Sequence, residues 1–341
     1  MKKRKTFRFI IVCGLICILL GTVITAATYN YGSQHYSGQL AEVETYAQNF
    51  DINAVNSIQI FGVSASVYIE KGDRFSVVAE NVPKDSFSIE LTPNGILDIT
   101  MNRNGNLGNY INFLPLFPVP IRVFNWQVVG WGPNNIFSSE YAKIYVYIPD
   151  SDEKIFNNLW IMENVGNIKI DNIKCDNLNM FSNVGNVSID NFYTDSLYLT
   201  DGVGRVDLTG TVGKGKTAIN GRVGNTNLNL LEPSDGEIFV NGGVGIINID
   251  AAVNNTVRIE GGVGNIVWNG AINGDLYIDG GVGSINFNLA GNSDDYNIST
   301  SSGVGNIHIN GFKTNYNVDY NTAKYNIEIY GGIGSIKLDI K

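Results

Sequence analysis

One glycine motif recurs nine times along the chain, and no other feature of the sequence constrains the fold as strongly. A complete copy reads GGVGNIVW, at residues 261–268. The last glycine of each copy stands at Gly166, Gly185, Gly204, Gly224, Gly245, Gly264, Gly283, Gly305 and Gly334. Successive spacings are 19, 19, 20, 21, 19, 19, 22 and 29 residues. A period this regular is typical of repeat proteins, in which each unit packs against the next.

Aligning the copies on this glycine separates inward from outward positions. The positions two and four residues after it are almost always apolar, as at Ile266 and Trp268, whereas the position between them is mostly polar. This alternation predicts a β-strand with one buried face. A second strand precedes the turn, with inward pairs such as Leu276 and Ile278. The Val or Ile directly before the glycine is also expected to point inward.

The rest of each repeat predicts a third, shorter side and a stacked coil. Apolar residues on this side are Ile173, Phe192, Val253, Ile272 and Phe312. Asp, Asn or Thr stands five residues after each motif glycine, where short polar side chains can form hydrogen-bonded ladders between rungs. Parallel rungs stack about 4.8 Å apart, so nine rungs would make a rod about 40 Å long. The predicted fold of residues 156–341 is all-β, a single-stranded parallel β-helix (β-solenoid) with rungs of about 20 residues.

The N-terminus has the features of a membrane anchor. Residues 1–8 carry five basic side chains, and the apolar segment 9–28 contains 19 uncharged residues from Phe9 to Ala27. That length is just enough for a transmembrane helix. The basic flank predicts a cytoplasmic N-terminus and a single-pass cell-membrane protein with most of the chain outside. A cleaved signal peptide is the alternative, because small residues follow the apolar run.

The exported part of the chain is acidic. Of the 23 Lys and Arg residues, five precede the apolar run, so the chain beyond residue 28 has 18 of them against 32 Asp and Glu, a net charge of −14. Such a surface disfavours nucleic acids and anionic lipid headgroups. Cys175 is the only cysteine beyond the apolar run, so no intrachain disulfide can form there. Stability must therefore come from stacking and burial.

The region between anchor and repeats is less regular. Residues 29–51 are polar and predict a spacer, and residues 52–155 predict an irregular β cap that closes one end of the stack. Within the cap, the segment 109–135 is apolar, aromatic and too rich in proline for a central strand. It could contact a partner, or it could fold over the open end of the stack. The candidate contact residues are Phe117, Phe124, Trp126 and Trp131.

The sequence predicts no catalytic, cofactor or metal site. Calcium-binding β-rolls need Asp two residues after the motif glycine, where this chain has Ile, Val or Thr. There are only two histidines, His35 and His308, too few for histidine-based acid–base or zinc chemistry. Asp207 stands beside Asn227 and Asn248 in the outward column and has no carboxylate partner there. We therefore expect a protein that is not an enzyme.

The sequence resembles a known bacterial family. The runs SIQIFGVSASVYIE (57–70) and AKIYVYIP (142–149), followed by the glycine repeats, are similar to a putative-adhesin family of unknown function related to auto-transporter adhesin heads. The resemblance covers about residues 55–341. It implies a right-handed coil at the cell surface behind one N-terminal helix, and it supplies no catalytic residues. Some relatives are encoded with envelope-stress systems, which implies a sensing or regulatory role.

Three functional hypotheses follow. The first is a membrane-anchored, extracellular protein that binds by surface contact, adhesin-like or envelope-associated. The second is an envelope-stress accessory protein that binds cationic antimicrobial peptides, which the acidic exported part would attract. The third is a polysaccharide-cleaving β-helix enzyme. The expected partner is a cell-surface or envelope component, such as a cationic peptide or a glycan.

Overall fold

The computed structural model describes ten segments of the chain, and all the statements below concern them. They are residues 43–84, 87–101, 142–149, 154–163, 165–182, 184–200, 202–221, 223–301, 303–313 and 323–341. The predicted anchor (9–28) and the apolar segment 109–135 lie outside these residues. Almost all described residues belong to one compact unit, Glu44–Arg103 with Ala142–Lys341. In this part of the chain, no helix is long and apolar enough to cross a membrane.

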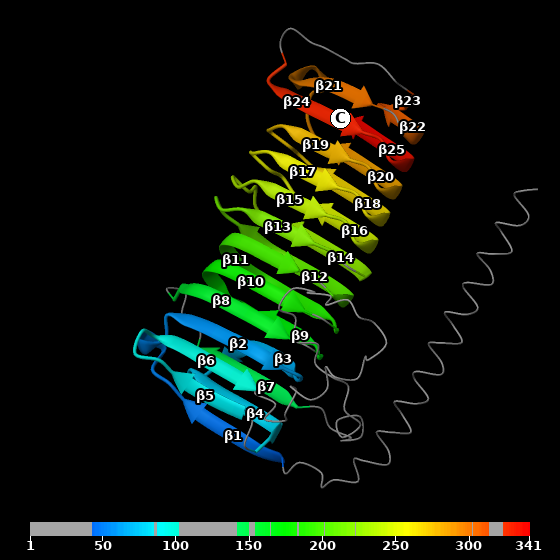
Figure 1. Ribbon diagram of the computed structural model, residues 1–341. Coiled ribbons are helices and arrows are strands. Elements are labelled where there is room, and N and C mark those ends of the chain that lie inside the picture. Colours follow the sequence, from blue (N-terminus) through cyan, green and yellow to red (C-terminus); the bar gives the residue numbers. More distant parts are fainter. Residues whose placement is uncertain are drawn as a thin grey trace, which may run out of the picture. The chain divides into compact units, whose positions relative to one another are not determined.

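The described chain is all-β, with its strands hydrogen-bonded into one continuous 25-stranded sheet that coils on itself (Figure 1). Each rung has one strand before the glycine corner and one after it. We call the two resulting surfaces the entry face and the motif face. For example, β13 (Thr217–Asn220) lies on the entry face and β14 (Val223–Leu230) on the motif face. Neighbouring rungs pair in parallel and in register, as Thr226 does with Ile247.

On the entry face the strands stack in an order that the pairings fix. That order is β6 (Ile96–Met101), β2 (Ser57–Val63), β8 (Phe156–Glu163), β10 (Lys174–Ser182), the end of β11 (Val187–Thr200), β13, β15 (Ile238–Asn241), β17 (Val257–Glu260), β19 (Leu276–Asp279), β24 (Tyr325–Tyr330) and β21 (Tyr296–Ser301).

The motif face runs beside it in the same direction. Its order is β7 (Lys143–Pro149), β3 (Ser66–Gly72), β9 (Ile168–Asp171), the start of β11, β12 (Val203–Val212), β14, β16 (Val244–Asp250), β18 (Val263–Gly270), β20 (Val282–Leu289), β25 (Ile333–Ile340) and β22 (Val304–Ile309). The two faces enclose a single apolar core.

A short third side joins one rung to the next. In the lower rungs β11 runs through it without a break, with a register irregularity between Asp190 and Phe192. In the upper rungs it is reduced to isolated parallel bridges, such as the one between Val253 and Ile272. Four of the five predicted inward residues here are buried, but Phe312 is 75% exposed. Phe312 lies in β23 (Phe312–Lys313), which pairs antiparallel with β22 at the end of the stack.

Two rungs are out of sequence order. The last coil of the chain, β24 and β25, is inserted between the β19–β20 rung and the β21–β22 rung (Figure 1). The chain therefore passes one rung position and returns, which accounts for the long spacing between Gly305 and Gly334. At the other end, β2 and β3 lie inside the rung made by β6 and β7.

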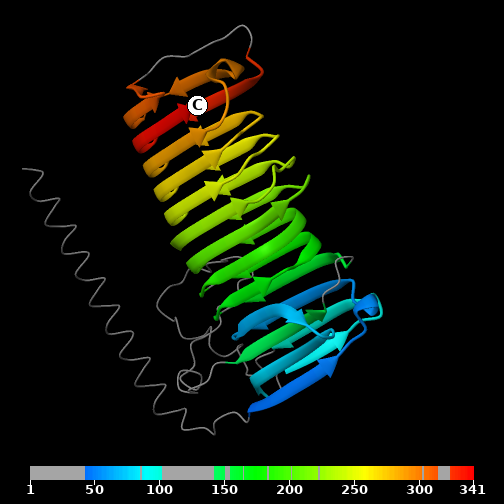
Figure 2. The same ribbon diagram turned by 180° about the vertical axis from the view of Figure 1, so that it is seen from behind.

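Antiparallel strands close the N-terminal end of the stack (Figure 2). β5 (Phe87–Leu91) pairs antiparallel with β6, β4 (Ser76–Pro83) pairs antiparallel with β7, and β1 (Val43–Asn49) pairs with β4. Parallel edges attract further strands, and this change of direction ends the repeat. The domain boundary predicted near residue 155 stays a prediction. The strands β2 and β3 before it already stack in register with β8 and β9 after it.

The inward columns predicted from the sequence form the core. The residues two and four positions after the motif glycine are buried in the described rungs, with Ile266 at 4% and Trp268 at 0% exposure. Trp268 stacks on Phe287 of the next rung, with ring centroids 6.1 Å apart. Burying side chains of this size stabilises a fold by about 1.5–3 kcal/mol each before conformational entropy is deducted. The column therefore contributes a large share of the buried apolar surface.

The prediction that the residue before the motif glycine points inward is wrong. These side chains are 41–74% exposed and form one column: Val165, Val184, Val203, Val223, Val244, Val263, Val282, Ile333 and Val304. The motif strand begins at this residue in most rungs, as β18 begins at Val263, so the two-residue alternation extends back through the glycine. The residue before the glycine then shares the outward direction of the first and third residues after it. We call this column the valine stripe.

The motif glycines are required by the spacing between rungs. At Gly264 the backbone has φ +142°, and a Cβ there would lie 1.8 Å from the carbonyl oxygen of Gly245 in the rung below. The same conflict repeats at Gly283, whose Cβ would meet the carbonyl oxygen of Gly264. Rungs one strand spacing apart leave no room for a side chain at this corner.

Replacing Gly264 with Ala should therefore destabilise the protein by several kcal/mol, because the clash is with backbone of an adjacent rung. Two other glycines serve as controls that separate the steric clash of an added Cβ from the cost of a positive φ angle. Gly311 has φ +81° with nothing within 4 Å of an added Cβ, so Gly311→Ala should cost only about 1–2 kcal/mol. Gly291 would make ordinary contacts, so Gly291→Ala should lie within about 0.5 kcal/mol of wild type. The measurement is denaturant unfolding of the three variants. An equal loss of unfolding free energy in all three would contradict the role of the close rung spacing.

Candidate functional site

The four predicted contact residues, Phe117, Phe124, Trp126 and Trp131, lie outside the described residues. Their role therefore stays a prediction. The described surface consists of outward columns on the two faces and the corner between them. Each column is a row of side chains at rung spacing, so function must be sought in what these rows carry.

The polar columns of the motif face are hydrogen-bonded ladders. Asn227 donates to Asp207 at 2.7 Å, and Asn248 donates to Asn227 at 2.7 Å. Arg205 donates to the two oxygens of Asp207 at 2.7 and 3.0 Å, and this contact is the main reason that the pKa of Asp207 is lowered. Asp207 is thus an ionised carboxylate whose oxygens are already bound. It has the environment of a structural group and not of an acid–base catalyst.

A second ladder confirms the predicted polar column five residues after the motif glycine. Asn269 donates to Asp250 at 2.6 Å, and Asn288 donates to Asn269 at 2.7 Å. Each bond joins one rung to the next, so these side chains reinforce the parallel pairing of the backbone. Their donors and acceptors are used within the stack.

The described residues contain no cluster of three or more His, Cys, Asp or Glu that could hold a metal ion. His308 points outward from β22, half-buried, in register with Lys337. Cys175 is buried, and burial raises the pKa of its thiol to about 12, so it is an unreactive core residue.

Glu163 is the one described carboxylate that is wholly buried. It ends β8 at 0% exposure and accepts a 3.5 Å hydrogen bond from Ser182 in the rung above. Its other oxygen has no hydrogen-bond partner among the residues described. Burial therefore raises its pKa to about 8, so the side chain is mostly neutral at pH 7.

An aromatic band crosses the first rungs of the entry face. It consists of Phe61, Trp160, Phe181 and Tyr198, one ring from each of four successive rungs. Successive ring centroids are 5.3, 6.5 and 5.6 Å apart. Trp160 is 37% and Tyr198 41% exposed, so the rings contact one another and also solvent. Asn179 lies between Trp160 and Tyr198 in register and places an amide beside the rings.

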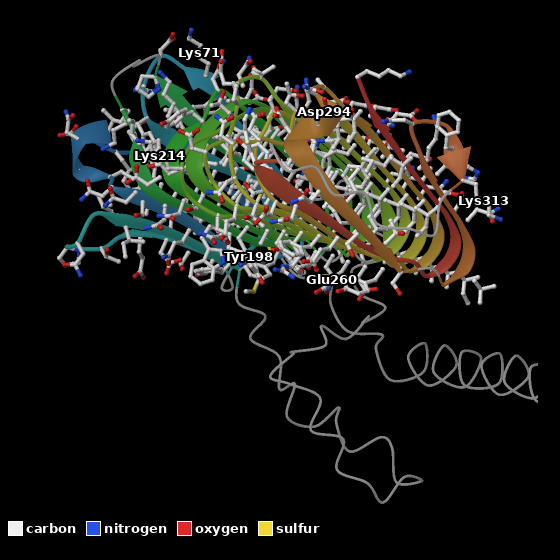
Figure 3. All side chains as sticks on the ribbon, turned by 90° about the horizontal axis from the view of Figure 1, so that it is seen from above. Lys71, Tyr198, Lys214, Glu260, Asp294 and Lys313 are labelled. Carbon is white, nitrogen blue, oxygen red and sulfur yellow. The ribbon has the colours of Figure 1, made fainter. Side chains whose placement is uncertain are left out.

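Further along the same face the character changes from aromatic to acidic. Glu260 and Asp279 are exposed neighbours in register on β17 and β19. Tyr198 and Glu260 lie on the same side of the stack when it is viewed along its length (Figure 3). Arg258 lies over the Tyr277 ring at 4.6 Å and supplies a positive charge beside this pair. The entry face thus offers an aromatic end and a more acidic end.

The aligned motif columns do not reveal the aromatic band, because its rings alternate between two outward columns. Trp160 is opposite Gln59, while Phe61 is opposite Met162 two residues further on. No single aligned column is therefore aromatic. The signal in the sequence is the pair of outward positions in the strand before the corner, where these four rings stand in successive rungs.

These features define a class of protein: an all-β stack of parallel strands with a closed apolar core and exposed columns of side chains. The chain belongs to the Toastrack DUF4097 family, which matches residues 55–331. This confirms the resemblance noted from the sequence. Among curated proteins no match was found.

Two solved structures are similar to this chain. One is a crystal structure of a putative adhesin from Bacteroides fragilis, which is 13% identical in sequence. The match covers 88% of this chain and 99% of the adhesin chain, with a TM-score of 0.43. The other is a putative cell adhesion protein from Clostridium sporogenes, also 13% identical, with 88% and 100% covered and a TM-score of 0.25.

The buried carboxyl group of Glu163 predicts a pH dependence of stability. Its pKa is about 8 in the folded chain against an ordinary value of 4.5, so folding favours the protonated form. The stabilisation is complete below about pH 4.5 and is lost as the pH rises toward 8. Relative to Glu163→Gln, wild type should lose on the order of 3 kcal/mol of unfolding free energy between pH 5 and pH 8.

The measurement is denaturant unfolding of both proteins across that range, with the difference between them as the readout. Glu70→Gln, on the outward side of β3, is the matched control and should show no such difference. An equal pH slope in wild type and Glu163→Gln would mean that Glu163 is ionised in the folded protein.

Proposed function

We propose that this protein binds a partner of the cell envelope by surface contact, in the manner of an adhesin, and that it catalyses no reaction. In this proposal residues 9–28 anchor the chain in the cell membrane, and the coil, right-handed as in the family, stands outside. Membership of a family that the sequence links to putative adhesins supports a surface-binding role in general. The polar columns support the absence of catalysis, because their functional groups are hydrogen-bonded within the stack.

The observation that carries the proposal is the aromatic band. Exposed Trp and Tyr rings offer large apolar surface at low entropic cost, and they are enriched at binding sites for this reason. A glycan presents faces of C–H groups edged with hydroxyls. Such faces pack on aromatic rings while amides such as that of Asn179 bond the hydroxyls. We therefore assign the band as the contact surface for an envelope glycan.

A cationic peptide is the second candidate, and a different observation favours it. Glu260 and Asp279 form an exposed acidic pair on the entry face, and the chain beyond residue 28 has a net charge of −14. Binding of this kind depends on long-range attraction and weakens as salt rises. Stacking on the aromatic band is largely insensitive to salt.

The test is binding of the full chain to a panel of envelope glycans and to a cationic antimicrobial peptide, each at low and moderate salt. Glycan affinity should fall at least tenfold in Trp160→Ala, because one ring of the band is lost. Tyr330→Ala is the control, since Tyr330 is 53% exposed on the same face near the far end. Its affinity should match wild type.

Other outcomes decide between the candidates. Salt-sensitive peptide binding that falls in the double variant Glu260→Gln, Asp279→Asn, with no glycan binding, would replace the glycan by the peptide. Binding of neither ligand would contradict both assignments. Release of reducing ends or unsaturated sugars from any glycan would overturn the non-enzymatic role.

A further inference from the structure

The valine stripe runs along the corner between the two faces, through all nine glycine motifs. In stacking order its members are in parallel register, Val203 with Val223, then Val244, Val263 and Val282. At rung spacing, nine members make a ridge about 40 Å long. The band and the acidic pair occupy the entry face, so this ridge is a separate surface.

The composition of the stripe is not explained by the turn alone. Other outward columns of the motif strands vary freely, and the one four residues after the stripe contains Lys, Ser, Asp, Asn, Val and His. The stripe is Val in eight rungs and Ile in the ninth. A β-branched shape suits a strand, but Thr provides that shape equally well and is better solvated. An apolar environment in the working protein explains why Val or Ile, and never Thr, stands at all nine positions.

The residues directly beside the stripe are uncharged in its upper half, and the acidic pair Glu260 and Asp279 lies beyond the glycines. Glycine pairs lie on one side, such as Gly261 and Gly262, and Asn265 and Ser284 lie on the other. The glycines lack side chains, so a shallow hollow that is open to solvent extends beside the ridge over five rungs. Its lining includes Val244, Val263 and the glycines. Ridge and hollow therefore lie side by side with the same period.

The apolar area matches that of an interface. Nine aliphatic side chains with roughly half their surface exposed form a patch on the order of 600 Å², above the few hundred Å² that a monomer ordinarily exposes. With the adjoining glycine hollow, it approaches the roughly 800 Å² per partner of a stable protein–protein contact.

We propose that the valine stripe is a homodimer interface, in which two copies of this chain pair in parallel about a two-fold axis that runs along the stack. A second copy presents the same ridge and the same hollow at the same rung spacing, so the ridge of each can lie in the hollow of the other along the five rungs that form the hollow. An unrelated partner has no reason to share that period. Such a contact is isologous and closes as a dimer.

Charge favours the same face. The chain beyond residue 28 is strongly acidic, so two copies repel each other across most of their surface. The corner with its glycines, valines and neutral amides is where two copies can approach with least repulsion. With the axis along the stack, each rung lies beside the same rung of the second copy, so Val244 lies across the axis from Val244 of that copy.

Cysteine cross-linking of the full chain in membranes tests this inference. Cys13 and Cys17 are first replaced by Ser, and Cys175 is retained because it is buried. With a short bis-maleimide, Val244→Cys should give a covalent dimer at the axis. Val267→Cys is the matched control, because Val267 lies one rung away and points outward from the middle of the motif face. It should give at least tenfold less dimer.

A second variant separates the interface from the fold. Adding Val263→Thr and Val282→Thr to the Val244→Cys chain keeps the β-branched shape but removes apolar surface, so cross-linking should fall severalfold with an unchanged melting temperature. Equal cross-linking at positions 244 and 267, or none at 244, would overturn the inference. The aromatic band lies on another face, so the glycan-binding test with Trp160→Ala and the cross-linking test at position 244 are independent. Failure of one proposal would leave the other unaffected.

Discussion

The close stacking of backbone at the glycine corner is the constraint on which the rest of the structure depends. A Cβ on Gly264 would lie 1.8 Å from the carbonyl oxygen of Gly245, so successive rungs meet here with nothing between their backbones. Because the corner is fixed, each motif strand starts at the same point in its rung. Register then follows without further specification, and the isoleucine columns, the aromatic stack of Trp268 on Phe287 and the asparagine ladders all line up. In a sheet with period-two alternation, a slip of one residue would turn every one of these side chains over.

This dependence explains which features could be predicted from the sequence. The inward column of Ile266 and its counterparts was evident, because a repeat shows its own alignment and period two assigns one side. The same rule applied to Val263 would have placed it outside, since it is an odd number of residues from Ile266. A general preference for burying valine led to the opposite prediction. In the structure the pleat determines the direction, and the apolar character of the side chain does not change it.

Other features are not contained in the local pattern. The insertion of the β24–β25 rung between β19–β20 and β21–β22 is a choice of neighbour for a whole rung, made far along the chain from the strands it pairs with. Every rung carries the same corner and compatible columns, so the motif cannot distinguish one neighbour from another. The only trace in the sequence is the spacing of 29 residues before Gly334. Phe312 was misplaced for a related reason, because its burial required a rung beyond it, whereas its strand lies at the end of the stack.

The repeat that secures the fold also limits where recognition can occur. Side chains in the core are occupied by packing, and the amides and carboxylates of the polar ladders are occupied by one another, so neither set has much left to offer a partner. Binding energy must then come from outward rows that the stack does not consume. Two rows of the described surface meet that condition, the rings around Trp160 on the entry face and the valine stripe at the corner. The two rows face different directions. Two chains paired through their corners would therefore still expose both aromatic bands, one on each chain. A dimer of this kind would bind an extended, repetitive partner at two places at once, and for such a partner avidity rises without any new contact.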